Sequence, residues 1–504
     1  MLLELSQDKH LSYDIDINLP INDLKYAYEI IYYQAKRIKE LEEIIELQKA
    51  EIQRLNDIKA KDSHNSSKPP STDGYRKITR SKKEKNKRKV GGQNGHKGST
   101  LHKVDNPDKT IIYHVDKCDC GCNLENEKII DYESRQVFDI PPVKYIVTEH
   151  KAEIKICPDC GKEIKGVFPE DVKSPVQYGN QVKSTAVYLT NYQLLPYERL
   201  SELFFDLYEL PISQSSLVNI NKRCSDLLEE EEKNRKEALI KSPTAHFDET
   251  GVRVNGKRNW LHSCGTEKLT FYDYHCKRGK EAMDEINILP HFHGRAIHDH
   301  WKPYFQYSCE HGLCNAHHIR ELTFIYEEYN QRWAEKMINL LVKINKRVEE
   351  AKSWTDHLDE KTLKIFDAKY DRIIREGFRE NKSIKVLFNL KKKGRKKQSK
   401  SKNLLDRLKK FKQETLAFMY DFTVSFTNNL GENDLRMMKV QQKISGAFRS
   451  EDGVKSFCRT RGYISTAKKN DQNVLDALEK VFLGKPIMPD DYLMAEAFAK
   501  PPPV

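Results

Sequence analysis

The spacing of apolar residues changes several times along the 504-residue chain, and each change predicts a different kind of element. Residues 24–55 repeat with a period of seven, which is typical of a coiled coil because that period keeps the seam residues on one helix face. Residues 173–240 carry apolar side chains at helical spacing. Residues 245–275 alternate between apolar and polar side chains, so they predict strands.

The seven-residue repeat predicts self-association. Its first seam position holds Leu24, Ile31, Ile38, Ile45 and Ile52, and its second holds Ala27, Gln34, Leu41, Gln48 and Leu55. Ile at the first position with Leu at the second favours a parallel two-stranded coil. We therefore expect a homodimer or higher homo-oligomer, although the two seam glutamines weaken that expectation. The alternative is one amphipathic helix packed on its own chain.

The alternating region predicts a small sheet. Two strands flank Asn255-Gly256, which is a strong signal for a two-residue hairpin turn. A third strand follows in KLTFYDYH, then a helix in GKEAMDEINIL, and then a fourth strand in RAIHDH. Three antiparallel strands, a crossover helix and a fourth strand are the front half of a ribonuclease-H-like sheet. In that arrangement Asp248 and Asp299 lie on adjacent strands.

Those two acids predict a cation site. A buried aspartate is costly unless it is paired or bound to a metal, and hard carboxylate oxygens suit Mg²⁺ or Mn²⁺. The alternative is two ordinary polar residues at strand ends. Glu432, on a later predicted helix, can supply a third acid. Arg436 and Lys439 lie four and seven residues further on, so they share its helical face and predict phosphate contacts.

The cysteines predict zinc. A CPxCG knuckle contains Cys157 and Cys160, and its Gly161 lets backbone amides turn toward the Cys160 thiolate. The other group, KCDCGC, is irregular and leaves open which two of Cys118, Cys120 and Cys122 bind. Two such groups would give four sulfurs to one tetrahedral Zn²⁺, and the alternative is a pair of degraded, metal-free knuckles.

The amino-acid composition predicts a polyanionic partner. The chain has 87 Lys+Arg against 75 Asp+Glu, a net charge of +12, and nucleic acid is the commonest partner of such a chain. Nine Lys/Arg and one Glu lie in residues 76–89, and twelve Lys/Arg and one Asp in 391–412. We read the first stretch as a DNA-binding arm that includes Lys87, Arg88 and Lys89. A solvated linker or loop is the alternative for both stretches.

The same composition excludes other classes. The longest apolar runs are too short to span a membrane, and the N-terminus is too acidic for a secretory signal. Eleven cysteines without such a signal argue for reduced thiols or metal sites rather than disulfides. We therefore expect a cytoplasmic protein, associated with the nucleoid.

The order of motifs resembles the insertion sequence sixty-six family of DDE transposases. The motifs are NSSKPPSTD, GGQNGHKG, the paired knuckles, HFDETG, IHDHWKPYF, CNAHHIREL and NNLGENDLRMMKVQQKISG. The resemblance spans nearly the whole chain. It departs from the family pattern in the irregular first knuckle and in Gly431, where related sequences often have Ala.

The resemblance implies an enzyme whose acidic triad is Asp248, Asp299 and Glu432. It implies Mg²⁺-dependent DNA cleavage and strand transfer at terminal inverted repeats and target DNA, helped by companion proteins of the element. DNA contacts from Lys443 and Arg449 would extend the basic helix face. A nuclease that cuts without joining, and an inactive DNA-binding relative, are the alternatives.

The resulting fold class is a multidomain α+β chain. A ribonuclease-H-like catalytic core with a helical insertion follows a coiled coil, a zinc-finger-like module and a helical domain. The predicted segments are coiled coil 1–62, basic arm or linker 63–110, zinc-finger-like 111–172, helical and either helix-turn-helix or plain bundle 173–240, first core part 241–320, helical insertion 321–414, second core part 415–470 and C-terminal tail 471–504.

Several side chains near the acids have open roles. On an extended strand, His298 and His300 would point away from the face of Asp299, so we do not expect them to share a metal with it. Trp301 and Tyr304 either stack on bases or pack internally. The Cys/His string in residues 309–318 holds either zinc or structural hydrogen bonds.

Overall fold

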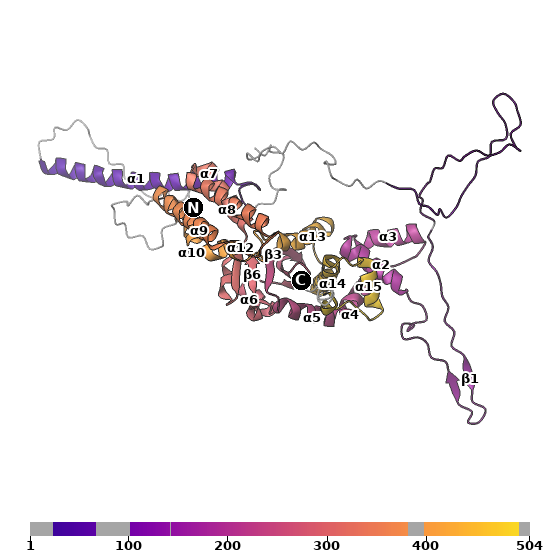
Figure 1. Cartoon of the computed structure of the whole chain (residues 1–504). Helices are drawn as coiled ribbons and strands as arrows, with labels where there is room; N and C mark the ends of the chain where they lie inside the picture. Colours follow the sequence, from indigo (N-terminus) through magenta and orange to yellow (C-terminus); the bar gives the residue numbers. More distant parts are fainter. Residues whose placement is uncertain (1–23, 67–100, 142, 382–397, 493–504) are drawn as a thin grey trace. The chain divides into compact units, whose positions relative to one another are not determined.

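The structure is a computed structural model, and it describes residues 24–66, 101–141, 143–381 and 398–492 (Figure 1). The chain divides into two compact units, one of residues 1–74 with 314–426 and the other of residues 75–313 with 427–504. The predicted contacts Lys87, Arg88 and Lys89 lie outside the described residues, as do residues 391–397 of the basic stretch 391–412.

The second unit is built on a five-stranded sheet. Its strands, in the spatial order β5-β4-β3-β6-β7, are β5 (Thr270–His275), β4 (Lys257–Gly265), β3 (Thr244–Val254), β6 (Arg295–His298) and β7 (Glu310–Leu313). The pairs β3–β4 and β4–β5 are antiparallel, whereas β3–β6 and β6–β7 are parallel. The first and fourth predicted strands, β3 and β6, are therefore neighbours, as the sequence predicts.

The hairpin between β3 and β4 forms at the predicted turn. Asn255 and Gly256 are the two turn residues, and both have positive φ, 49° and 73°. That conformation matches the twist of the flanking strands, and Asn-Gly adopts it at low cost. The turn sets the register in which Asp248 pairs with Ser263.

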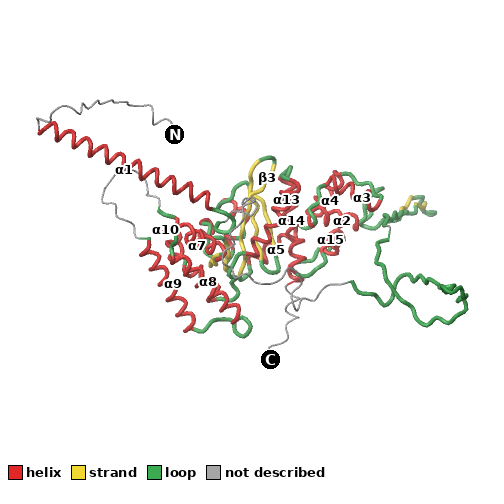
Figure 2. The backbone as a smooth tube through the Cα atoms, turned by 90° about the horizontal axis from the view of Figure 1, so that it is seen from above, coloured by secondary structure: helices red, strands yellow, loops and turns green. Residues whose placement is uncertain are grey.

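Both faces of the sheet are covered, and successive side chains of β3 point alternately to one face and the other. On one face Phe247 packs with Phe271, Met283 and Phe292, from β5 and from the segment around α6 (Lys280–Ile286). On the other face Val252 packs in a cluster with residues of α13 (Asn429–Ser445) and α14 (Glu451–Lys469). Figure 2 shows α13 and α14 beside the strands, so Asp248, which has the parity of Val252, faces these helices.

A helical layer continues from α14. It contains α2 (Asn180–Val187), α3 (Tyr197–Tyr208), α4 (Gln214–Leu227), α5 (Glu229–Ile240) and α15 (Val474–Phe482), with a π-helical turn at Tyr188–Tyr192. Residues 471–504 are predicted as a tail, yet α15 lies within them, and Leu478 and Val481 are fully buried against α2 and α4. Helix α15 is thus part of a core.

The first unit is helical. Its helices are α1 (Leu24–Ala60), α7 (Asn315–Tyr329), α8 (Arg332–Ala351), α9 (Glu360–Glu380), α10 (Lys400–Lys410), α11 (Lys412–Thr415) and α12 (Ala417–Tyr420). Helices α8, α9 and α10 pack closely at Gly377, where a Cβ would come within 2.5 Å of Leu405 and 3.0 Å of Trp333. Gly377 therefore permits a helix approach that any larger residue would obstruct.

The C-terminal end of α1 is tied to these helices by Asp57. Its carboxylate is 5% exposed and lies 2.6 Å from Nζ of Lys400. The Tyr329 hydroxyl donates to the same carboxylate at 2.9 Å, and Gln53 donates from the preceding turn. The seam residues nearer the N-terminus of α1 are solvent-exposed, for example Ile38 at 57%.

The cysteine-bearing segment has little regular structure. It contains one antiparallel pair of three-residue strands, β1 (Ile154–Ile156) and β2 (Glu163–Lys165), whose residues are all exposed. Among its described residues, none between Leu101 and Ser174 is buried. The segment therefore has no hydrophobic core of its own in the described residues.

Candidate active site

The site begins with the register between β3 and β6. Thr244 pairs with Arg295 and His246 with Ile297, so the ladder ends two residues before Asp248 and Asp299, which keep the same offset. Both aspartates are partly buried. The sequence predicts this juxtaposition, because it follows from placing the fourth strand beside the first.

Asp299 lies just beyond the strand. The prediction that the fourth strand runs through His300 is wrong at its end, because β6 stops at His298 and His300 has a positive φ of 75°. The Trp301 amide donates to Oδ1 of Asp299 at 3.0 Å, which turns the chain. A tight turn rather than strand alternation therefore orients Asp299.

His298 is a buried structural residue. It is fully buried and stacks on Tyr304 with ring centroids 4.4 Å apart. The His300 amide donates to its Nδ1, so in neutral His298 the proton sits on Nε2, which donates to Nδ1 of His311 at 3.2 Å. Burial, followed by the neighbouring histidines, holds the pKa of His298 well below its usual value, which favours this neutral form.

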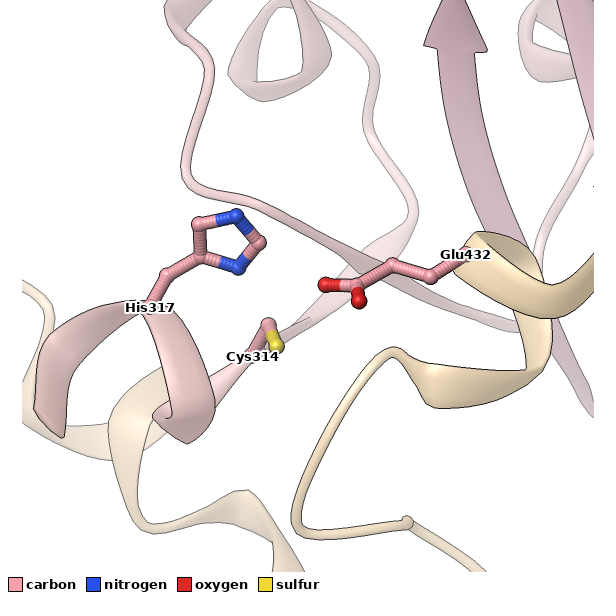
Figure 3. A group of neighbouring side chains, drawn as sticks. All are labelled: Cys314, His317 and Glu432. Carbon is pink, nitrogen blue, oxygen red and sulfur yellow. The ribbon is translucent and has the colours of Figure 1, made fainter. Parts of the chain in front are cut away.

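Glu432 reaches the site from α13. It lies in the first turn of that helix (Figure 3). The buried Asn428 before the helix fixes its start: its Oδ1 is 2.8 Å from Nδ1 of His246, and its Nδ2 donates to the Phe247 carbonyl at 2.9 Å. Helix α13 therefore begins directly against β3, next to Asp248.

The three acids interact electrostatically. Burial raises the pKa of Asp248 to about 8, and the negative charges of Glu249, Asp299 and Glu432 add to that rise. The Glu249 amide opposes it by donating to Oδ1 of Asp248 at 2.9 Å. A partly buried cluster of like charges is the environment in which a divalent cation replaces a proton. The donor set is all carboxylate oxygen, which fits Mg²⁺ or Mn²⁺.

Glu249 faces the opposite side of β3. Its carboxylate accepts from Nε and a terminal nitrogen of Arg278 at 2.9 and 2.6 Å, and from the Tyr304 hydroxyl at 2.6 Å. Burial, together with the charge of Asp299, raises the pKa of Glu249, and the two hydrogen-bond partners oppose that rise. Sequence reasoning assigned no role to Glu249 or Arg278, since no spacing rule links residues 29 positions apart.

The predicted basic face of α13 divides into two kinds of residue. Nζ of Lys439 donates to the Gly251 carbonyl at 3.2 Å, so this side chain lies against β3. Burial lowers the pKa of Lys439, as does Arg258, while Asp248 opposes the shift. Lys439 is nevertheless exposed overall, as are the remaining predicted contacts of this helix and the following loop, namely Arg436, Lys443 and Arg449.

Asp434 serves another purpose on the same helix. It forms an ion pair with Lys469 of α14 at 2.8 Å, beside Thr270 at the start of β5. Its pKa is raised by burial against the opposing effect of Lys469. Asp434 therefore ties α13 to α14 rather than joining the acid cluster.

Both cysteine groups form local turns. Gly161 has φ +69° and donates to the Cys157 carbonyl at 2.9 Å, and Gly121 has φ +93° and donates to the Cys118 carbonyl at 2.8 Å. Backbone amides, first that of Cys160, lower the pKa of Cys157.

The thiol chemistry fits zinc, although the two groups are separate. Hydrogen bonding from the Cys122 backbone, followed by the neighbouring thiols, lowers the pKa of Cys120 to about 7. Thiolates are the form that binds Zn²⁺. Among the described residues, no three of the five sulfurs lie within 4.8 Å of one another. The local turns are thus formed, whereas a four-sulfur site is not assembled.

The Cys/His string after β6 has mixed roles. Cys309 is buried in the cluster around Phe247, and His311 pairs with His298 as described above. Cys314 directly precedes α7 and His317 lies in its first turn (Figure 3). His318 is buried, 3.2 Å from Oδ1 of Asn315. Within the described chain, no three of the five Cys and His ligand atoms gather within 4.8 Å.

Comparison with known families agrees with this geometry. The model of the Transposase IS66 family matches residues 175–456, which contain the three acids, and the zinc-finger binding domain of transposase IS66 matches residues 116–161, which contain both cysteine groups. A family of unknown function matches residues 17–102. No curated protein matches the chain. In the described part of the chain, every helix is too short or too polar to cross a membrane.

Proposed function

The chain belongs to the IS66 transposase family, and from this premise we propose that it binds the ends of an insertion sequence and carries out Mg²⁺-dependent DNA cleavage and strand transfer. Asp248, Asp299 and Glu432 form the catalytic triad. The observation that carries the proposal is the parallel pairing of β3 with β6, whose ladder ends two residues before both aspartates, close to the start of α13.

The sheet supports a ribonuclease-H-like core. Three antiparallel strands, β3 to β5, are followed by a helix and two strands that run parallel to β3, in the order β5-β4-β3-β6-β7. The third acid arrives from a helix that packs on the face of Asp248. Between β7 and that helix the chain inserts α7 to α12, which fits the proposed helical insertion.

The triad residues would hold the cation through their carboxylate oxygens. Bound Mg²⁺ supplies Lewis-acid activation of a hydroxyl nucleophile and stabilisation of the leaving oxygen. The chain contributes position and charge. Asp248 has to give up its proton to act as a ligand, and Asn428 and the Trp301 amide hold Glu432 and Asp299 in place.

Exposed cations near the acids suit the DNA backbone. Arg436 follows Glu432 by one helical turn, and Lys443 and Arg449 extend the exposed charge toward the end of α13 and beyond. Phosphate contacts of this kind give affinity without sequence readout. The cysteine module and the basic arm at 87–89 would add contacts to the terminal repeats, and such a protein would associate with the nucleoid.

Helix α1 supports self-association through a coiled coil. The seam side chains Ile31, Ile45 and Ile52 are 63%, 46% and 58% exposed, so the chain itself does not bury them. A second copy of α1 would bury that stripe. Ile38→Asp should shift the protein toward a monomer in light scattering, while Glu43→Gln, which alters an off-seam position, should leave the oligomer unchanged. An equally oligomeric Ile38→Asp would contradict the coil.

The proposed function is tested with Asp299→Asn in the full-length protein and DNA that carries the terminal repeats of the element. Cleavage with Mg²⁺ should fall by at least about 10³-fold, equivalent to about 4 kcal/mol of transition-state stabilisation, while DNA binding persists. Asp206→Asn, on the exposed surface of α3, is the matched control.

Two results would count against the proposal. If Asp299→Asn cleaved DNA with Mg²⁺ at the wild-type rate, the assignment of the catalytic triad would be wrong. Cleavage by the wild-type protein without joining of a pre-cut end to target DNA would reduce the function to that of a nuclease.

A further inference from the structure

Glu249 is the acid next to Asp248, and it is engaged on all sides. Its side chain is 1% exposed. One carboxylate oxygen accepts two hydrogen bonds from the Arg278 guanidinium, and the other accepts one from the Tyr304 hydroxyl at 2.6 Å. Because β3 alternates, this carboxylate lies on the face opposite Asp248. It is therefore placed to hold neighbouring segments rather than to join the triad directly.

Both partners of Glu249 lead to the turn that carries Asp299. Tyr304 belongs to the short helix Lys302–Gln306, five residues after Asp299. The Arg278 guanidinium stacks on Trp301 at 4.1 Å, and the Trp301 amide donates to Oδ1 of Asp299. Two routes, one through a hydroxyl and one through a stacked guanidinium, thus connect β3 to this turn.

The Arg278 guanidinium also contacts two indole rings, although its side chain is 37% exposed. It lies between two indoles, 4.8 Å from the ring of Trp260 and 4.1 Å from that of Trp301. Its fork meets Glu249 with two nitrogens, which fixes orientation as well as distance. A lysine could supply the charge at this position but not the planar stacking.

Asp299 needs such support because the sheet does not provide it. The last pair of the β3–β6 ladder is His246 with Ile297, and β6 ends at His298. Asp299 is therefore beyond the last ladder hydrogen bonds. Its distance from Asp248 depends on the turn from Asp299 to Tyr304, and this turn is what Glu249 holds.

Burying a carboxylate and a guanidinium together seldom stabilises a fold more than an apolar pair would. Here the ion pair lies one residue from the triad and reaches the loop of its second member. We propose that Glu249 is a positioning residue, which acts through Tyr304 and Arg278 to hold Asp299 at the distance from Asp248 that a shared cation requires. This inference rests on the proposed function of the triad.

The test uses Glu249→Gln and Tyr304→Phe in the full-length protein. Each variant nearly keeps the side-chain volume. Glu249→Gln removes the charge that pairs with Arg278, and Tyr304→Phe removes the hydroxyl that donates to Glu249. Mn²⁺ binding is measured without DNA by electron paramagnetic resonance, and the Mg²⁺ concentration for half-maximal cleavage is measured in parallel. Glu249→Gln should weaken both by about 10–100-fold, as is typical when a group that orients a ligand is lost. Tyr304→Phe should cause a smaller loss of the same kind.

Tyr307→Phe is the matched control. Its hydroxyl donates to Asp284 at 2.7 Å, near the same loop but away from Glu249, so it should leave metal binding unchanged. Thermal melting reports folding for each variant. If Glu249→Gln fails to fold, Tyr304→Phe decides the question, because one buried hydroxyl is removed with the ring retained.

The outcomes separate this inference from the proposed function. If Glu249→Gln and Tyr304→Phe bind Mn²⁺ and cleave DNA like the wild type while Asp299→Asn is inactive, the positioning role is overturned and the triad stands. If Asp299→Asn itself still cleaves, the triad and the positioning role both fall. Weakened Mn²⁺ binding in both Glu249→Gln and Tyr304→Phe, with normal melting temperatures, supports the proposal.

Discussion

The sheet around Asp248 and the cysteine segment between Leu101 and Ser174 both carry residues of the kind that bind metals, but they hold them differently. Asp248 extends from β3, Asp299 lies in the turn directly after the neighbouring strand β6, and Glu432 extends from a helix anchored to β3. The cysteines lie in a segment with two three-residue strands and, among its described residues, none that is buried.

This difference separates two ways of building a site. In the sheet, strand pairing and an anchored helix bring the acids together, and burial there raises the pKa of Asp248. In the cysteine segment, the turns at Gly121 and Gly161 are set locally, and its described apolar side chains are exposed rather than packed into a core. Metal binding is then also the source of folding free energy for such a segment.

The largest expected effect concerns the cysteine segment. Cys157→Ser combined with Cys160→Ser should abolish zinc binding, which we expect at about one ion per chain with four sulfur ligands. Trypsin should then cut within residues 101–172 much faster, while the melting of the sheet stays unchanged. Native mass spectrometry and timed proteolysis measure both effects.

Cys276→Ser is the matched control, because Cys276 is exposed and belongs to neither knuckle. If the sheet melted at a lower temperature in the double variant, the stability of the sheet would depend on the cysteine segment, and the two regions would not be independent. Undiminished zinc in that variant would contradict the assignment of the second knuckle.

A smaller effect is expected from loosening the sheet site. Asn428→Ala removes both hydrogen bonds that join the start of α13 to β3. The loss should cost about 1–3 kcal/mol of unfolding free energy, because His246 and the Phe247 carbonyl lose buried partners. Denaturant unfolding measures this cost. Zinc content should be unaffected, and wild-type stability of Asn428→Ala would mean that other contacts anchor the helix.

The smallest effect concerns pH. Burial raises the pKa of Asp248 to about 8 from its ordinary 3.8, so ionisation is harder in the folded than in the unfolded protein. Without divalent cations, the contribution of Asp248 to stability therefore falls as pH rises from about 4 toward 8. Asp248→Asn resembles the neutral carboxyl, so at pH 8 it should melt roughly 2–5 °C higher than the wild type.

The same variant should respond differently to metal. Mg²⁺ should raise the melting temperature of the wild type at pH 8, because a cation offsets the repulsion among the acids, but it should have little effect on Asp248→Asn. An identical pH profile for both proteins would show that the Asp248 environment is more polar than its burial indicates.

Local rules predicted much of the sheet and of its acids. Short-range patterns predict the Asn255-Gly256 turn, the alternation of β3 and the adjacency of β3 and β6. The position of Asp248 near Asp299 follows from these features. Those patterns could not locate the end of β6, because the positive φ of His300 depends on the turn that follows rather than on strand propensity.

Contacts between distant residues could not be predicted from the sequence. The ion pair of Glu249 with Arg278, the hydrogen bonds of Asn428 to β3 and the burial of Asp57 against Lys400 depend on tertiary packing. The roles of Arg436, Lys443 and Arg449 toward DNA stay predictions, as do the boundaries of the predicted segments.

The most direct measurement is the binding of Mn²⁺ to the full-length protein by isothermal titration calorimetry at pH 8, for the wild type, Asp248→Asn, Asp299→Asn, Glu432→Gln and the surface control Asp206→Asn. If the three carboxylates share the cation, each triad variant loses at least about tenfold in affinity, or about 1.4 kcal/mol, and the control binds like the wild type. Unchanged affinity in all three triad variants would contradict the account.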